Sequence, residues 1–212
     1  MSDNLDLAQK GISIPGLAQA ALENPAVMRQ LLDGIAPAAR SANIRSNSSE
    51  ALQLLNRTNP HELLPHWDYF VGLLGSGNGF AQYPAIHILA NLAPVDRDGR
   101  FDRAFDLFYS LLDSDSVMIV AHVAGVSGQI ALAQLHLRAR IVQRLLAARM
   151  SGLEETRRDL ARGYIVDALD ACMADAPDQV PILAFVRQQQ QTGSPGARKK
   201  AGAFLKKWEK AA

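Results

Sequence analysis

"LLGSGNGFAQYPAIHILANLA", Leu73 to Ala93, and "LLDSDSVMIVAHVAGVSGQIA", Leu111 to Ala131, align without a gap at an offset of 38 residues. Each stretch opens on two leucines and a turn that contains serine, and each closes on an amide, an aliphatic residue and alanine. The apolar positions of the first stretch follow helical spacing, and the second stretch repeats them apart from one serine. The sequence therefore repeats a helix face, which predicts a repeat architecture.

The segments that precede the two turns are also helical in pattern. "FDRAFDLFYSLL", residues 101–112, has a strong amphipathic stripe, and "HELLPHWDYFVGLL", residues 61–74, has a less regular one. One repeat is thus a helix, a short turn and a second helix. Weaker copies upstream and downstream give about five helical hairpins with a period of roughly 35 to 40 residues.

On this period and pattern the chain from Pro25 onward resembles the HEAT-repeat family, most specifically between His61 and Gln134. The aspartate that this family carries in the turn is matched loosely by Asp113 and Asp115 in one repeat and by Asn78 in another. The resemblance implies an all-α fold, a right-handed α-solenoid of about five HEAT-like hairpins. It also implies that the second helices line a concave surface that binds another macromolecule.

The domain organisation follows from the repeats. Residues 25–212 are expected to form the HEAT-like repeat domain. Residues 1–24 are expected to be an N-terminal segment that either caps the array, with a short helix near Pro15 to Glu23, or stays partly disordered.

The charge balance limits the classes of partner. The 212 residues have a net charge of +1, which argues against a nucleic-acid footprint over the whole molecule. Residues 134–212, however, contain 14 Lys and Arg against 8 Asp and Glu, so an acidic partner would be steered to the C-terminal end. Five lysines surround the apolar stripe of the last helix: Lys199, Lys200, Lys206, Lys207 and Lys210.

The cysteine count and the N-terminus bear on the compartment. The single cysteine, Cys172, excludes an intramolecular disulfide framework and a multi-cysteine metal site, and it is expected to be a small buried hydrophobe. "MSDNLDLAQK" has acidic residues where a signal peptide needs positive charge, and no apolar run approaches 18 residues. We expect a soluble cytoplasmic protein with no membrane partner.

The glycines of "GSGNGF", residues 75–80, raise the question of a phosphate-binding loop. Such loops follow a strand, and the lysine-containing type needs G-x-x-x-x-G-K-[ST], whereas here an amphipathic helix precedes and no lysine follows. We expect Gly75, Gly77 and Gly79 to supply positive φ at the turn, and no nucleotide or other cofactor to bind.

The histidines do not form a metal-binding pattern. No two of His61, His66, His87, His122 and His136 are spaced i, i+4, as two ligands on one helix face would be. His87 and His122 fall in successive second helices but three positions out of alignment. No metal site is predicted.

Trp67, Asp68 and Tyr69 suggest an alternative function. DNA-alkylation-repair glycosylases are also built from HEAT-like repeats and place aromatic residues and an aspartate around an extruded nucleotide, so a related nucleic-acid-binding protein stays the alternative. With two tryptophans and a near-neutral charge, packing of Trp67 and Phe70 between hairpins is favoured.

The expected function is that of a non-enzymatic scaffold that binds a protein or peptide through its concave face. An arginine cluster could contact phosphates or an acidic peptide if several of its members faced one groove: Arg138, Arg140, Arg144, Arg149, Arg157, Arg158 and Arg162. No catalytic residue is assigned. The partner-binding residues are predicted on the polar side of the second helices: Gln82, His87, Asn91, Gln129, Arg158 and Arg162.

Overall fold

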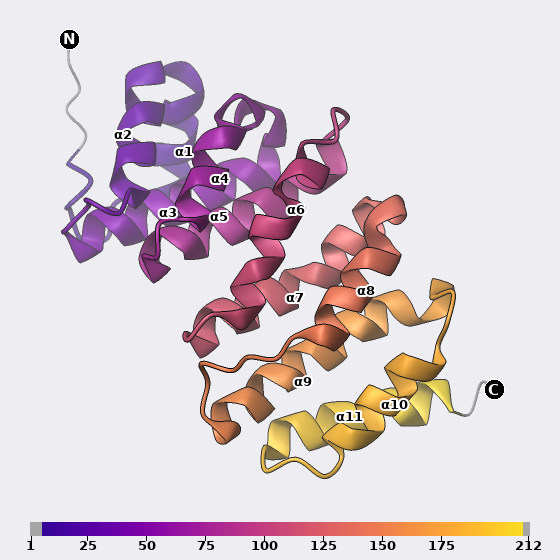
Figure 1. The fold of residues 1–212 in the computed structure, drawn as a ribbon. Coiled ribbons are helices and arrows are strands. Elements are labelled where there is room, and N and C mark those ends of the chain that lie inside the picture. Colours follow the sequence, from indigo (N-terminus) through magenta and orange to yellow (C-terminus); the bar gives the residue numbers. More distant parts are fainter. Residues whose placement is uncertain (1–5, 210–212) are drawn as a thin grey trace. The chain divides into compact units, whose positions relative to one another are not determined.

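The computed structural model describes residues 6–209 (Figure 1). Residues 1–5, where the expected capping or partly disordered segment begins, and residues 210–212, where the expected repeat domain ends and which include Lys210, lie outside the described residues. Over the described residues the chain forms eleven α-helices and short 3₁₀ segments, without a β-strand. The expected all-α class is therefore confirmed.

The chain divides into two compact units, Met1–Asp98 and Gly99–Ala212. The first, called unit 1, contains α1 (Ile14–Glu23), α2 (Pro25–Ile35), α3 (Ala42–Thr58), α4 (Trp67–Leu74) and α5 (Gly79–Leu92). The second, called unit 2, contains α6 (Arg100–Ser110), α7 (Val117–Ala133), α8 (Arg138–Ala147), α9 (Glu155–Cys172), α10 (Val180–Gln189) and α11 (Pro195–Trp208). Among the described residues, no helix is both long enough and apolar enough to cross a membrane.

In unit 1 the helices pack as hairpins with α1 added at the beginning. α2 packs on α3, α4 packs on α5, and α3 lies beside α5, while α1 contacts both α2 and α3. The close crossing of α2 and α3 needs a glycine, because a Cβ on Gly34 would overlap the Ser48 side chain. α1 coincides with the helix expected near Pro15 to Glu23, and Ser13 caps it by accepting a hydrogen bond from the Gly16 amide.

In unit 2 the longer helices form the centre. α7 lies beside α9, and α9 lies beside α11, while α8 packs against α9, and α10 packs against α9 and α11. Small residues allow these helices to approach closely: a Cβ on Gly128 of α7 would lie 2.9 Å from the Ala171 Cβ of α9, and one on Gly163 would lie 3.2 Å from the Cα of Ala197 in α11. Larger side chains at either glycine would push the neighbouring helices apart.

The second helix of each hairpin begins at a nearly constant interval along the sequence. The N-cap residues of α3, α5, α7, α9 and α11 are separated by 37, 38, 38 and 40 residues, and they are Ser41, Asn78, Ser116, Glu154 and Ser194. The offset of 38 found between two stretches of sequence thus holds for the helix boundaries as well. It also extends to helices whose sequences resemble each other only weakly.

The turn at Gly75–Asn78 corrects one expectation. Of the three glycines expected to have positive φ, only Gly77 does, at +66°. Gly75 has a φ of −80° and Gly79 is the first residue of α5. Asn78 completes the turn by accepting hydrogen bonds from the amides of Phe80 and Ala81 at 3.0 and 3.3 Å.

The equivalent turn of unit 2 depends on Asp113. Its Oδ1 accepts hydrogen bonds from the backbone amides of Arg149 and Met150, at 3.1 and 3.0 Å, in the turn that follows α8. Met150 has a φ of +51°, which is uncommon for a side chain of its size. Asp113 therefore connects the turn before α7 to the turn that follows α8.

Candidate functional site

In unit 1, the second helix of the α4–α5 hairpin, α5, presents a narrow accessible stripe. Phe80, Tyr83, His87 and Asn91 occupy the positions i, i+3, i+7 and i+11, and they are the exposed or half-buried side chains between Phe80 and Leu92. The ring of Tyr83 packs edge-on against His87, with 4.9 Å between centroids. Phe80 is 67% exposed, and the Arg45 guanidinium of α3 lies over its ring at 4.7 Å.

The predicted residues of α5 separate into two groups. His87 and Asn91 lie one turn apart on the accessible stripe, as expected. Gln82 does not: it is only 7% exposed, and its Nε2 donates a hydrogen bond to the Leu74 carbonyl oxygen at 2.8 Å. Its polar group closes the α4–α5 turn and is not available to a partner.

The predicted residues of unit 2 also separate into an accessible group and an internally bonded group. Gln129 lies on the accessible stripe of α7 together with Met118, His122 and Gly125. The accessible stripe of α9 is formed by Leu160, Tyr164, Asp167 and Ala171, at i, i+4, i+7 and i+11.

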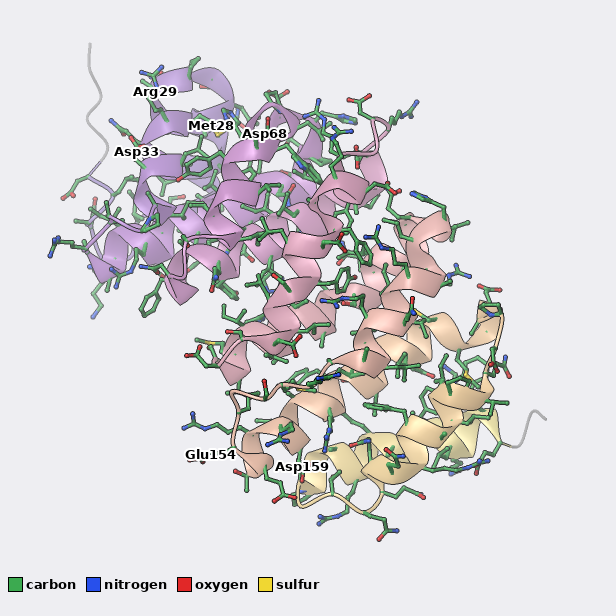
Figure 2. All side chains as sticks on the ribbon, in the orientation of Figure 1. Met28, Arg29, Asp33, Asp68, Glu154 and Asp159 are labelled. Carbon is green, nitrogen blue, oxygen red and sulfur yellow. The ribbon has the colours of Figure 1, made fainter. Side chains whose placement is uncertain are left out.

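Arg158 and Arg162 are placed by this periodicity on the opposite side of α9. Arg158 donates to the carbonyl oxygen of Leu153 at 3.0 Å, and Arg162 pairs with the buried carboxylate of Asp159 at 3.2 Å. Asp159 also accepts a hydrogen bond from the Gly193 amide at 2.8 Å. Figure 2 labels Glu154 at the start of α9 and Asp159 one turn further along. The two arginines therefore hold the turns around α9 in place and do not face the accessible stripe.

The wider arginine cluster does not converge on one groove. Arg138 pairs with Asp175 at 2.7 Å, Arg140 pairs with Asp106 at 2.7 Å, and Arg144 donates to the Tyr109 carbonyl oxygen at 3.2 Å. The contacts of Arg140 and Arg144 join α8 to α6, and Arg138 joins the start of α8 to the 3₁₀ segment that follows α9. The cluster thus acts mainly in packing, which polarity alone did not indicate.

A groove that the sequence did not predict lies between α7 and α9. Val117, Met118, Ala121 and His122 line it from α7, and Leu160 and Tyr164 line it from α9, around a volume of about 180 Å³. Met118 and Leu160 are 53% and 45% exposed. Burial lowers the pKa of His122 below its usual 6.5, so the groove is uncharged at neutral pH. The available signal was two large apolar residues, at 118 and 160, on the solvent side of the helical pattern.

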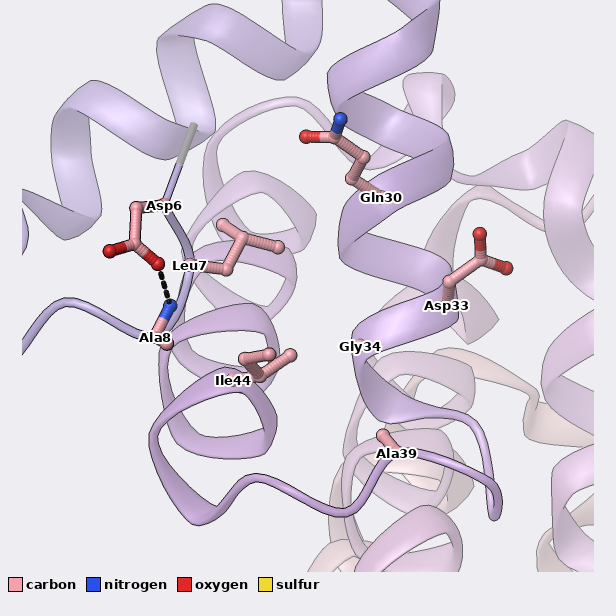
Figure 3. A pocket seen from close by; sticks show the side chains of 8 residues that line it. All are labelled: Asp6, Leu7, Ala8, Gln30, Asp33, Gly34, Ala39 and Ile44. Carbon is pink, nitrogen blue, oxygen red and sulfur yellow. Dashed lines mark hydrogen bonds between the residues drawn. The ribbon is translucent and has the colours of Figure 1, made fainter. Parts of the chain in front are cut away.

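Unit 1 contains two larger pockets. One, of about 510 Å³, is shown in Figure 3, where Asp6 and Asp33 lie on opposite sides and Leu7 and Ile44 lie between them. Asp6 accepts a hydrogen bond from the Ala8 amide, while the Gln30 Oε1 is buried without a partner in the described chain.

The second pocket of unit 1 has a similar volume and lies beside α2. Met28, Arg29, Glu62 and His66 are among its lining residues, and Figure 2 labels the first two on α2. Burial lowers the pKa of His66 below 6.5. Neither pocket of unit 1 contains a residue of the predicted partner-binding set.

The surroundings of the histidines and of Cys172 bear on metal and redox chemistry. No three His, Cys, Asp or Glu side chains gather into a potential metal site between residues 6 and 209. The imidazole of His136 pairs with Asp102 at 2.9 Å. Burial raises the pKa of the Cys172 thiol to about 11, so this thiol is a poor nucleophile.

Of the aromatic residues considered for nucleotide binding, Trp67 is buried in the core and Tyr69 is half-buried. Trp67 is 2% exposed, Phe70 is fully buried, and the Tyr69 hydroxyl donates to the Leu32 carbonyl oxygen at 2.6 Å. Burial, with a smaller contribution from Asp33, raises the pKa of Tyr69 to about 12. A nucleotide base could not stack on Trp67 without displacing the core.

Comparison with known proteins finds no family model that matches the chain, and no curated protein and no solved structure that resembles it. The candidate site therefore rests on the geometry of the second helices alone.

Proposed function

We propose that the chain is a non-enzymatic, HEAT-like scaffold that binds a protein or peptide partner through the face formed by its second helices. The proposal includes a right-handed α-solenoid of five hairpins, which are α2–α3, α4–α5, α6–α7, α8–α9 and α10–α11. The observation that carries it is the recurrence of the second-helix N-caps every 37 to 40 residues, with second helices side by side within each unit. A regular series of helices offers an extended surface, which repeat proteins use for binding.

The long-range polar contacts support a repeat array. Asp102 pairs with His136, Asp106 with Arg140, and Asp113 with the amides of Arg149 and Met150, at sequence separations of 34 to 37. Further along, Asp159 bonds to Gly193 at a separation of 34, and Lys207 pairs with Asp170 at 37. Contacts that join each repeat to the next one are what a quasi-one-dimensional architecture requires.

The proposed binding face keeps only part of the predicted residue set. His87, Asn91 and Gln129 belong to it because they lie on the accessible stripes of α5 and α7. Gln82, Arg158 and Arg162 are left out because their polar groups form internal contacts. A cytoplasmic location is part of the proposal, supported by a single buried cysteine that forms no disulfide.

Site-specific photocrosslinking tests which face binds. A photoreactive residue at Gln129, on α7, is compared with one at Gln188. Gln188 is exposed and lies on α10, the first helix of the α10–α11 hairpin. Both positions are exposed, so neither substitution should disturb folding. In extract from the native cell we expect a discrete crosslinked partner from position 129 and none from position 188. Equal crosslinking, crosslinking from position 188 alone, or none from either position would refute the proposal.

Duplex DNA provides the test against the nucleic-acid alternative. A protein that contacts several phosphates loses affinity by orders of magnitude between about 50 and 200 mM salt. We expect no measurable binding at the lower salt concentration. Tight binding with a steep salt dependence would favour the alternative over a protein-binding scaffold.

A further inference from the structure

The groove between α7 and α9 has the dimensions of a single-residue anchor site. Its volume of about 180 Å³ is below the roughly 300 to 1,000 Å³ of drug-sized ligand pockets. Met118 and Leu160 place two large, partly exposed apolar side chains at this one groove. Adjacent exposed apolar residues are typical of interaction sites. The groove suits one apolar side chain of a partner.

The charges beside this groove are unevenly distributed. α7 contributes no Asp, Glu, Lys or Arg between Val117 and Ala133. Beyond α9, the accessible side of α11 carries four lysines, which are Lys199, Lys200, Lys206 and Lys207. The Lys200 ammonium lies 4.2 Å from the ring centroid of Tyr164, a residue of the groove. The lysine face of α11 therefore borders the groove.

Only part of this positive charge is neutralised within unit 2. Lys200 pairs with Asp167 at 2.6 Å, and Lys207 pairs with Asp170 at 2.9 Å. Lys199, Lys206 and also Arg157, one turn before Leu160, make no ion pair with any residue from 6 to 209. Acidic residues gather instead at the N-terminal ends of α7 and α9, where Asp115, Glu154 and Glu155 are exposed. The unpaired positive charge therefore lies at Lys199 and Lys206 on α11 and at Arg157 on α9.

We propose that this face binds an acidic peptide segment of a partner protein, with one apolar side chain between α7 and α9 and carboxylates over α11. This inference rests on the proposed function and specifies its partner. Packed helices are about 8 to 10 Å apart, so the middle of the groove and α11 are separated by roughly 12 to 15 Å. An extended peptide rises about 3.3 Å per residue. The carboxylates therefore follow or precede the apolar residue by about four or five positions.

Two synthetic peptides test this arrangement, since the direction of the chain is not fixed. Each has one leucine and three consecutive glutamates beginning four positions away, with glycine and serine elsewhere, and the second peptide has the reverse order. Binding to the full chain is measured by fluorescence anisotropy. We expect one of the two to bind, with affinity that falls as salt increases because exposed charges are screened.

Variants of the protein separate the anchor from the charges. Leu160→Ser should weaken binding about tenfold because it removes the apolar wall of the groove. Lys199→Glu with Lys206→Glu should weaken it at least as much and remove most of the salt dependence. Val180→Ser, at a 72% exposed apolar residue of α10, and Lys10→Glu with Arg29→Glu, in unit 1, are the matched controls and should leave affinity unchanged.

Several outcomes would overturn the inference. These are no binding of either peptide, equal binding when the leucine of the peptide is replaced by serine, or binding that Leu160→Ser leaves intact. Binding of duplex DNA through the same lysines would also overturn it. If position 129 still crosslinks to a partner while both acidic peptides fail, the proposed function stands and only this partner chemistry is wrong.

Discussion

The turn Gly75–Asn78 of unit 1 and the turn Asp113–Ser116 of unit 2 occupy the same position in the repeat, but different interactions hold them. In unit 1 the Asn78 side chain caps α5 locally, and Gly77 provides the positive φ. In unit 2 the Ser116 side chain makes no capping hydrogen bond to α7, and Asp113 instead binds two amides about 36 residues further along. One turn is closed by its own residues, and the other is connected to the next repeat.

This difference shows that a repeat can keep its geometry without keeping the interaction that produces it. A local cap stabilises the start of one helix, whereas a carboxylate that spans two turns stabilises their stacking as well. Substitutions in the two turns should therefore have different magnitudes and should affect different parts of the molecule.

The largest effect is expected for Asp113→Ala. Removal of the carboxylate leaves the amides of Arg149 and Met150 without their acceptor, and hydrogen bonds to charged groups are each worth about 1.5 to 3 kcal/mol. We expect a loss of about 2 kcal/mol, since water can reach the exposed Arg149 amide. Urea unfolding followed by circular dichroism measures it. Faster labelling of the buried Cys172 should accompany the loss because unit 2 opens more often.

Asp113→Asn is the control, because its side-chain carbonyl can still accept a hydrogen bond. It should recover part of the lost stability. If Asp113→Ala stays within about 0.5 kcal/mol of the parent protein, the connection between the two turns has no energetic role.

Asn78→Ala should cost about 1 kcal/mol, the usual value of an N-cap side chain. Its counterpart Ser116→Ala should be almost neutral, because the Ser116 hydroxyl caps nothing. Fluorescence of Trp67, in a Trp208→Phe background, follows the unfolding of unit 1. Equal losses for the two alanine variants would show that the turns are not stabilised differently.

Gly77→Ala should cost less, roughly 0.5 to 1 kcal/mol. The left-handed backbone at φ +66° costs an L-residue about 1 to 2 kcal/mol, and the reduced entropy of the unfolded chain returns part of it. Gly79→Ala, at the first position of α5, should be neutral or slightly stabilising because alanine favours the helix. The same urea experiment ranks them, and a larger loss at position 79 would contradict the assigned geometry.

These turns also show what sequence could predict. Helical spacing and the offset of 38 residues located the α4–α5 and α6–α7 turns, because caps and apolar periodicity are local signals. The contact from Asp113 to Arg149 and Met150 had no local signal. It depends on how one hairpin packs on the next, and single aspartates in turns are common.

The sequence likewise predicted only part of the candidate site, because polarity alone does not show whether a side chain has an internal partner. Polar residues were assigned to the accessible face, which is correct for His87, Asn91 and Gln129 as positions on the helices. Polarity fails where a buried polar group has an internal partner, as Gln82 does with Leu74 and Arg162 with Asp159. Conversely, the groove at Met118 and Leu160 was missed because apolar residues were assumed to be in the core.

The smallest expected effect concerns one histidine in each unit. Burial lowers the pKa of both His66 in unit 1 and His122 in unit 2 below 6.5, so the folded protein keeps them neutral in a range where the unfolded chain begins to bind protons. Stability should therefore fall as the pH drops below about 6.5, the ordinary pKa of a histidine in an unfolded chain. His66→Gln should flatten this dependence for unit 1, and His122→Gln for unit 2.

The two histidines differ in their surroundings, which makes the pH test a comparison of the units. His66 shares its pocket with Arg29 and Glu62, whereas no charged side chain lines the groove that contains His122. His122→Gln should therefore weaken the pH dependence of stability by the same amount at both salt concentrations. The effect of His66→Gln should change with salt, because the pocket around His66 contains charges that salt can screen. Urea unfolding between pH 7.5 and 5.5 at two salt concentrations measures both, with the exposed His61→Gln as control. Stability that rose on acidification in the parent protein would mean that its histidines are favoured in the charged form, the reverse of what their burial implies.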